Sequence, residues 1–181
     1  MQQIAINKRE MPYDVNEAMK LLRTNLQFCG KDKKVIMVGA GYIGCELATY
    51  LSMCKGCDVT CVDMADIVIS SENAVIEEWD DTNLREYITI NMRKNNVKTC
   101  LGVRVEEIRD DGVVVKHKDG TEEFLEAEAV VIATGMRPIA SEREALREAC
   151  LDFRVVGNAD KVGRIKDATA SGYAAGYYIG M

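Results

Sequence analysis

The stretch KKVIMVGAGYIGCELATYL, residues 33–51, carries more structural information than any other part of this 181-residue chain. Its first half is a short apolar run rich in β-branched residues, which predicts a buried strand over 35–38. A helical pattern over 42–53 follows it. The turn between them, GAGYIG at 39–44, is a GxGxxG sequence, which in this strand–turn–helix setting indicates a phosphate-binding loop.

Each glycine of the turn has a separate physical role in such a loop. Gly39 permits the tight turn after the strand, and Gly41 lets a pyrophosphate approach the backbone. Gly44 allows the helix to pack closely on the strand. The N-terminus of the helix then offers N–H groups and a partial positive charge to the phosphates.

The remaining sequence alternates between strand and helix patterns, with one interruption. Strands are predicted at 58–62, 97–101, 129–133 and 153–157, and helices at 15–28, 75–95, 141–149 and 166–179. In the long helix, the residues expected to face the core are Ile76, Trp79, Leu84, Ile88 and Met92.

The interruption is a run of three alternating segments, 104–109, 113–118 and 121–126, separated by Asp-Gly turns. It predicts a three-stranded antiparallel β-meander. The expected fold is therefore α/β: a Rossmann-like, doubly wound domain, with a parallel sheet, helices on both faces and the meander.

Asp63 ends the second predicted strand, 24 positions after Gly39. A carboxylate at this place can accept both ribose hydroxyls of an adenosine and would repel a 2′-phosphate. The next residues, Met64-Ala65-Asp66, offer no cation to such a phosphate. The sequence therefore favours NAD(H) over NADP(H).

Composition excludes several classes of protein. The net charge of −6 and the lack of a basic stretch argue against a nucleic-acid partner, and no apolar run suits a membrane span. The first residues lack the features of a signal peptide. The odd number of cysteines, seven, predicts reduced thiols in a cytoplasmic protein. Cys54 and Cys57 have no partner pair for a zinc site, and His117 is predicted to lie on the surface of the meander.

Three segments resemble one known family. VGAGYIGCELA at 38–48 and VVIATGMRPIA at 130–140 resemble two motifs of the FAD-dependent pyridine nucleotide-disulfide oxidoreductases. VVGNADKVGRIKDATASGYAAGYYI at 155–179 is similar to the FAD-domain end of one branch, the NADH:flavin oxidoreductases related to 2,4-dienoyl-CoA reductase and 2-enoate reductase. The resemblance covers about 33–181.

The resemblance implies a divided chain. Residues 1–32 would be an N-terminal helical segment, 33–138 the NAD-binding domain, and 139–181 a segment of the FAD domain. The chain would be a fragment or truncated relative that holds NADH for hydride transfer to FAD, in a parent enzyme that reduces an activated alkene. FMN and an iron–sulfur cluster would belong to modules beyond it, and the FAD site here would be incomplete. The partners would be the dinucleotide, the rest of the FAD domain and a catalytic barrel.

The family motifs also assign residues. Tyr42 matches an aromatic residue over the nicotinamide pocket, and Glu46 matches a carboxylate that reaches toward the nicotinamide. Thr134 and Gly135 match a turn beside the dinucleotide, while Gly157 and Asn158 stand where the family has Gly-Asp against FAD. The full set of expected cofactor-binding residues is Gly39, Ala40, Gly41, Tyr42, Ile43, Gly44, Glu46, Asp63, Met64, Thr134, Gly135, Gly157 and Asn158. No catalytic residue and no metal ligand is expected.

Two alternatives remain open. A stand-alone dinucleotide sensor or interaction domain would share the loop but has no need of the segment 155–179. A methyltransferase that uses S-adenosylmethionine also has an acid after its second strand. The meander and the turn Ala133-Thr134-Gly135 disfavour it.

Overall fold

The computed structural model describes residues 2–5, 30–69, 79–138, 140–148 and 153–179. Its contacts divide the chain into two compact units, Met1–Gly135 and Met136–Met181. The predicted helix over 15–28 and Ile76 lie outside the described residues. Within the described parts, none of the helices combines the length and apolar character needed to cross a bilayer.

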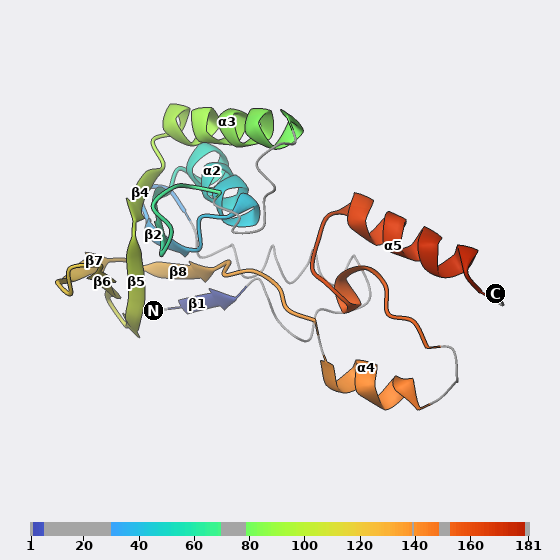
Figure 1. The fold of residues 1–181 in the computed structure, drawn as a ribbon. Coiled ribbons are helices and arrows are strands. Elements are labelled where there is room, and N and C mark those ends of the chain that lie inside the picture. Colours follow the sequence, from blue (N-terminus) through green and yellow to red (C-terminus); the bar gives the residue numbers. More distant parts are fainter. Residues whose placement is uncertain (1, 6–29, 70–78, 139, 149–152, 180–181) are drawn as a thin grey trace. The chain divides into compact units, whose positions relative to one another are not determined.

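The first unit is built on a five-stranded parallel sheet (Figure 1). In spatial order its strands are β1 (Gln2–Ala5), β8 (Ala129–Ile132), β2 (Lys34–Val38), β3 (Asp58–Asp63) and β4 (Lys98–Leu101). The register places Val38 beside Val62 on one side and beside Ile132 on the other. The residues that follow these three strands therefore meet at one edge of the sheet.

Two helices cover one face of the sheet: α2 (Tyr42–Lys55) and α3 (Trp79–Lys94), which lie side by side (Figure 1). In β2, Val35 and Met37 face these helices, since they share one buried cluster with Ala48 and Leu51 of α2. Ile88 and Met92 of α3 are buried as predicted. The expectation for Leu84 was wrong, because this side chain is exposed. Apolar spacing identifies the helix face that turns toward the core, but it does not separate residues at the centre of that face from residues at its border.

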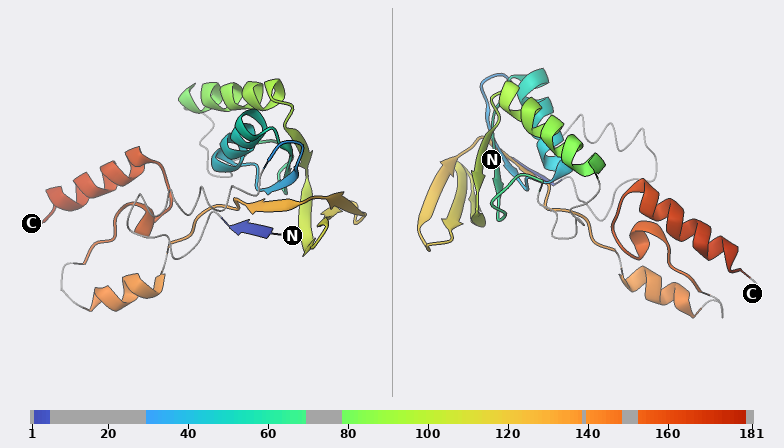
Figure 2. Two further views of the ribbon diagram at one scale, coloured as in Figure 1. Left: turned by 180° about the vertical axis from the view of Figure 1, so that it is seen from behind. Right: turned by 45° about the horizontal axis from the view of Figure 1, so that its top comes forward.

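The opposite face is covered by the predicted meander, which consists of β5 (Val103–Arg109), β6 (Gly112–His117) and β7 (Glu122–Glu126). The views in Figure 2 show these strands apart from the parallel ones. Val103, Val113 and Val115 of the meander share a second buried cluster with Ile36 and Val130 of the parallel sheet. The β-branched strands thus pack on both sides, as expected for the centre of an α/β sheet. The predicted α/β class with a meander is confirmed.

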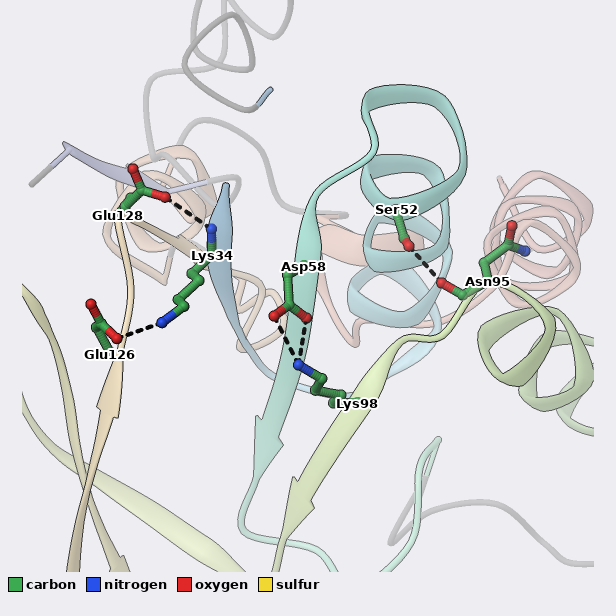
Figure 3. A network of polar contacts seen from close by, with 7 residues as sticks. All are labelled: Lys34, Ser52, Asp58, Asn95, Lys98, Glu126 and Glu128. Atoms are coloured by element: carbon green, nitrogen blue, oxygen red, sulfur yellow. Dashed lines mark hydrogen bonds and ion pairs between the residues drawn. The ribbon is translucent and has the colours of Figure 1, made fainter. Parts of the chain in front are cut away.

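Polar contacts cluster at the amino ends of the parallel strands (Figure 3). Lys34 pairs with Glu126 at 2.5 Å, and its backbone N–H donates to Glu128 at 3.1 Å. Lys98 pairs with Asp58 across β3 and β4 at 2.7 Å. Farther along, the Ser52 hydroxyl donates to the Asn95 carbonyl at 2.5 Å, which ties α2 to the end of α3. These contacts lie at the ends of the strands that are farthest from the glycine turn.

Burial separates the described cysteines into two chemical classes. Burial, with the nearby carboxylates of Asp63 and Glu46, raises the pKa of Cys45 to about 12, and burial likewise raises the pKa of Cys61. Cys54 is exposed, whereas Cys57 is buried and its thiol donates to the Gly30 carbonyl at 3.3 Å.

We therefore expect iodoacetamide at pH 8 to modify Cys54 rapidly in the native protein and to leave Cys45 and Cys61 unmodified until the domain unfolds, because only the thiolate reacts. Peptide mass spectrometry with and without urea measures this. Equal native rates at Cys54 and Cys61 would contradict the packing of α2 on β3.

The second unit contains α4 (Ala140–Arg147), a 3₁₀ turn at Gly157–Ala159 and α5 (Ile165–Tyr177). None of its described side chains is fully buried. The Arg154 guanidinium donates to the carbonyl of Tyr178 at 3.0 Å and so caps the end of α5. The exposed aromatic rings of Tyr173 and Tyr177 stack on α5 at 6.2 Å between centroids.

Two expectations about secondary structure differ from the structure. The strand predicted at 153–157 was wrong: Val156 has extended backbone angles, but no neighbouring strand pairs with it in the described part of this unit. A β-strand needs such a partner for its hydrogen bonds. Conversely, β1 was not predicted, and it pairs in parallel with β8 at the edge of the main sheet.

Candidate functional site

A cavity of about 490 Å³ opens where the carboxyl ends of β2, β3 and β8 meet. A volume of this size suits a cofactor or small ligand. Since β3 and β8 lie on opposite sides of β2, the cavity occupies the point where the strand order reverses, the usual ligand position in open α/β sheets. Most of the expected residues line it: Gly39, Ala40, Gly41, Tyr42, Ile43, Asp63, Met64, Thr134 and Gly135.

The glycine turn has the shape of a loop that receives a phosphate group. Gly39 has φ +105°, and an added Cβ would collide with the Ala133 carbonyl. A Cβ on Gly44 would collide with the Gly39 carbonyl, so α2 packs against the turn without any gap. A Cβ on Gly41 would meet nothing within 4 Å and would extend into open space beside the cavity. The turn is therefore closed toward the protein and open toward a ligand.

The start of α2 adds an electrostatic preference to this shape. Gly41 is the N-cap residue, so no side chain caps the helix, and the first turn carries no acidic residue. Uncapped N–H groups and the helix dipole favour an anion at this place. The residues present thus fit the diphosphate of a dinucleotide.

Asp63 has a structural role that the sequence did not reveal. Its Oδ2 accepts a hydrogen bond of 2.6 Å from the Ala40 N–H, and its Oδ1 accepts one of 2.9 Å from the Ala65 N–H. The carboxylate therefore joins the glycine turn to the loop after β3. Each carboxylate oxygen can accept a second hydrogen bond, so ribose hydroxyls can still bind there.

The loop after β3 is held from several directions. The Gly102 N–H donates to the Ala65 carbonyl at 2.9 Å, and the Ile69 N–H donates to the Ala40 carbonyl at 2.7 Å. Lys118 of the meander pairs with Asp66 at 2.6 Å. Met64, at the cavity wall, remains 67% exposed. The loop is therefore held in place, and Met64 already lines the cavity in this conformation.

Several cavity residues were missed by the sequence analysis, and Arg104 is the most informative of them. It lies on β5, far from the glycine turn in sequence, and the packing of the meander brings it to the cavity wall. The alternating pattern of the segment predicted its strand, but a single sequence does not say which end of that strand faces the ligand. The other missed residues are Val38, Val62, Val103, Val105 and Ala133.

Four expected site residues are not among those that line the cavity. Glu46 is exposed on α2, and Gly44 is buried beneath the turn. Gly157 and Asn158 belong to the second unit, where the Gly157 N–H donates to the Ser171 hydroxyl and the side-chain Oδ1 of Asn158 accepts from the Gly163 N–H. The roles of Glu46, Gly157 and Asn158 at cofactors stay predictions.

Comparison with known proteins places these observations in context. The family model described as pyridine nucleotide-disulphide oxidoreductase matches residues 6–162. NADH oxidase of Thermoanaerobacter brockii is 35% identical over 167 residues, which make up 91% of this chain and 24% of that protein. Cinnamate reductase of Clostridium sporogenes is 31% identical over 145 residues, 78% of this chain and 20% of that protein.

Solved structures show the same fold. A 2-naphthoyl-CoA reductase complex matches 98% of this chain with a TM-score of 0.65 and 23% identity. A 6-hydroxypseudooxynicotine amine oxidase of Pseudomonas geniculata matches 99% with a TM-score of 0.72 and 20% identity. This chain covers 26% and 24% of those proteins, and thus spans about a quarter of the length of the relatives it matches.

Proposed function

Since this chain belongs to the pyridine nucleotide-disulphide oxidoreductase family, we propose that residues 33–138 hold NAD(H) for hydride transfer to FAD in a longer flavin-dependent oxidoreductase. The observation that carries the proposal is the cavity in which the open side of the glycine turn, the start of α2 and the Asp63 carboxylate meet. When bound, NADH supplies the hydride, and this chain holds NADH in position.

Each group of the cavity has a part in this proposal. The N–H groups at the start of α2 bind the diphosphate, and Gly41 leaves the space that it occupies. Asp63 accepts the ribose hydroxyls while it keeps the turn in place through Ala40. Tyr42, partly buried against the core beside the cavity, shields the nicotinamide end.

Residues 1–32, expected to form an N-terminal helical segment, contribute strand β1 (Gln2–Ala5) to the sheet of the first unit. We assign residues 139–181 to the FAD domain of the parent protein. The lack of any fully buried side chain among the described residues of the second unit supports this, because such a unit needs a further surface to pack against. Gly157 and Asn158 alone do not make an FAD site.

For the substrate of the parent protein we propose an activated alkene of the enoate or dienoyl-CoA type. Support comes from the similarity to a cinnamate reductase and from the C-terminal segment that resembles the 2,4-dienoyl-CoA reductase branch. FMN and an iron–sulfur cluster would be held by modules of the parent outside this chain.

Titration calorimetry with NADH and NADPH tests the proposal. We expect Asp63→Ala to weaken NADH binding by about 10- to 100-fold, since it removes charge-assisted hydrogen bonds to the ribose and the tie to Ala40. Asp63→Asn, which keeps one acceptor oxygen, should have a smaller effect. Both variants should narrow the preference for NADH over NADPH, because the repulsion of a 2′-phosphate is lost.

Asp58→Asn is the matched control. Asp58 lies at the amino end of β3, the strand whose carboxyl end carries Asp63, and it pairs with Lys98. It should leave the affinity unchanged. A wild-type chain that binds neither nicotinamide dinucleotide would overturn the proposed function. Wild-type binding with an unaffected Asp63→Ala would overturn the ribose assignment alone.

A further inference from the structure

Two charged side chains line the dinucleotide cavity, and the proposed function accounts for only one of them. Asp63 is explained by the ribose and by the glycine turn. Arg104 supplies the opposite charge in a wall otherwise made largely of apolar residues such as Val103 and Val105. Its side chain is 65% exposed, so a ligand can reach it. An accessible cation in such a wall indicates a contact with the ligand.

Arg104 is held in one orientation by its own strand. Its Nε and Nη2 both donate to Oε1 of Glu106, at 2.9 and 2.5 Å. The two residues are two positions apart on β5 and lie on the same face of the meander. The carboxylate engages one edge of the planar guanidinium and leaves its flat faces unoccupied by that contact. A flat cation of this kind can stack on an aromatic ring.

The position of Arg104 along the cavity points to the adenosine end. In the proposed function the diphosphate would lie at the glycine turn and the adenosine ribose at Asp63, which would direct the adenine beyond the end of β3, past Met64. There a second cavity of about 350 Å³ adjoins the first, and the two share Met64, Val103 and Arg104. These three residues therefore surround the space that a base attached to that ribose would enter.

We propose that Arg104 is the residue that recognises the adenine: its guanidinium stacks on one face of the ring, with Met64 and Val103 as the apolar walls. This inference rests on the proposed function, since it requires a dinucleotide in the cavity. It adds a base-recognition residue that comes from the meander rather than from the parallel sheet. Adenine is neutral, so the contact adds affinity without a phosphate partner.

The alternative, that Arg104 binds a 2′-phosphate, agrees less well with its surroundings. A phosphate on that ribose would stand against the Asp63 carboxylate. The Nε and one Nη group of Arg104 already bind Glu106, and Lys118 of the neighbouring cavity already pairs with Asp66. A phosphate would have to share Arg104 and Lys118 with the carboxylates of Glu106 and Asp66, whereas stacking makes no demand on either ion pair.

The test compares Arg104→Gln with wild type in calorimetric titrations of NADH, ADP-ribose, NADPH and reduced nicotinamide mononucleotide, which lacks the adenosine. We expect Arg104→Gln to weaken NADH and ADP-ribose alike, by about five- to tenfold, and to leave the mononucleotide unaffected. Arg104→Lys keeps the charge but loses the plane, so it should weaken NADH nearly as much.

Arg109→Gln is the matched control. Arg109 lies on the same strand, binds Glu107 through the same two nitrogens at 2.9 and 2.7 Å, and is not among the residues that line either cavity. It should change no affinity, which separates a contact with the base from a general effect on the meander.

Other outcomes would overturn the assignment. A loss confined to NADPH would make Arg104 a phosphate ligand. Equal losses for NADH and the mononucleotide would place its effect outside the adenosine end, and unchanged affinities would remove it from the ligand altogether. Wild-type binding of NADH in the same experiment keeps each of these results distinct from a failure of the proposed function.

Discussion

Replacing Gly44 with alanine is expected to destabilise the domain by about 3 kcal/mol or more, a large part of the stability of a typical domain. The added Cβ would lie far closer to the Gly39 carbonyl than the 3.0 Å that real Cβ atoms keep. Relief would require the glycine turn or α2 to move away from β2. Urea denaturation followed by circular dichroism measures the change in the free energy of unfolding.

Gly172→Ala in α5 is the matched helical control. Nothing lies within 4 Å of the Cβ that it would add, so the substitution should be neutral or slightly stabilising through helix propensity. If the Gly44 variant unfolded at the wild-type urea concentration, the close packing of α2 on the glycine turn would be refuted.

Replacing Gly41 with valine is expected to separate binding from folding. Gly41 has ordinary backbone angles, φ −75° and ψ −175°, and an added Cβ has no protein atom within 4 Å, so the cost to stability should stay near 1 kcal/mol. The same side chain would fill the space proposed for the diphosphate. The loss of the charge-assisted hydrogen bonds proposed between the diphosphate and the start of α2 predicts NADH binding at least about 100-fold weaker.

The measurement is the dissociation constant of NADH together with the melting temperature of the same sample. Gly41→Ala serves as the graded variant, because its single methyl group should cause a smaller loss of affinity. A folded Gly41→Val protein that still binds NADH like wild type would locate the diphosphate elsewhere.

The sequence predicted those parts of the site that depend on residues close together along the chain. Gly39, Gly41 and Gly44 are informative because strand, turn and helix follow one another within a few residues. Asp63 follows from the length of one strand–helix–strand unit. The hairpin turns of the meander are likewise local, which is why its three strands were predicted near their observed positions.

The parts that could not be predicted depend on contacts between distant segments. β1 is four residues long and is defined by its pairing with β8, more than a hundred positions away. The residues near Val156 show the opposite situation. Their sequence has a strand pattern and their backbone is extended, but the described residues of their unit offer no strand to pair with. Arg104 reaches the cavity only because β5 packs across the sheet, and no local pattern encodes that placement.

The meander enters the chain between two strands of the parallel sheet and is joined to the loop after β3 through Lys118 and Asp66. The glycine turn is held by other segments, namely β3 through Asp63 and the start of α2. On the proposal made for Arg104, substitutions along β5 and β6 would change the contact with the base and leave the diphosphate contacts of the glycine turn intact. Choice of ligand and strength of binding would then be separately adjustable, and selection or protein engineering could act on one without disturbing the other.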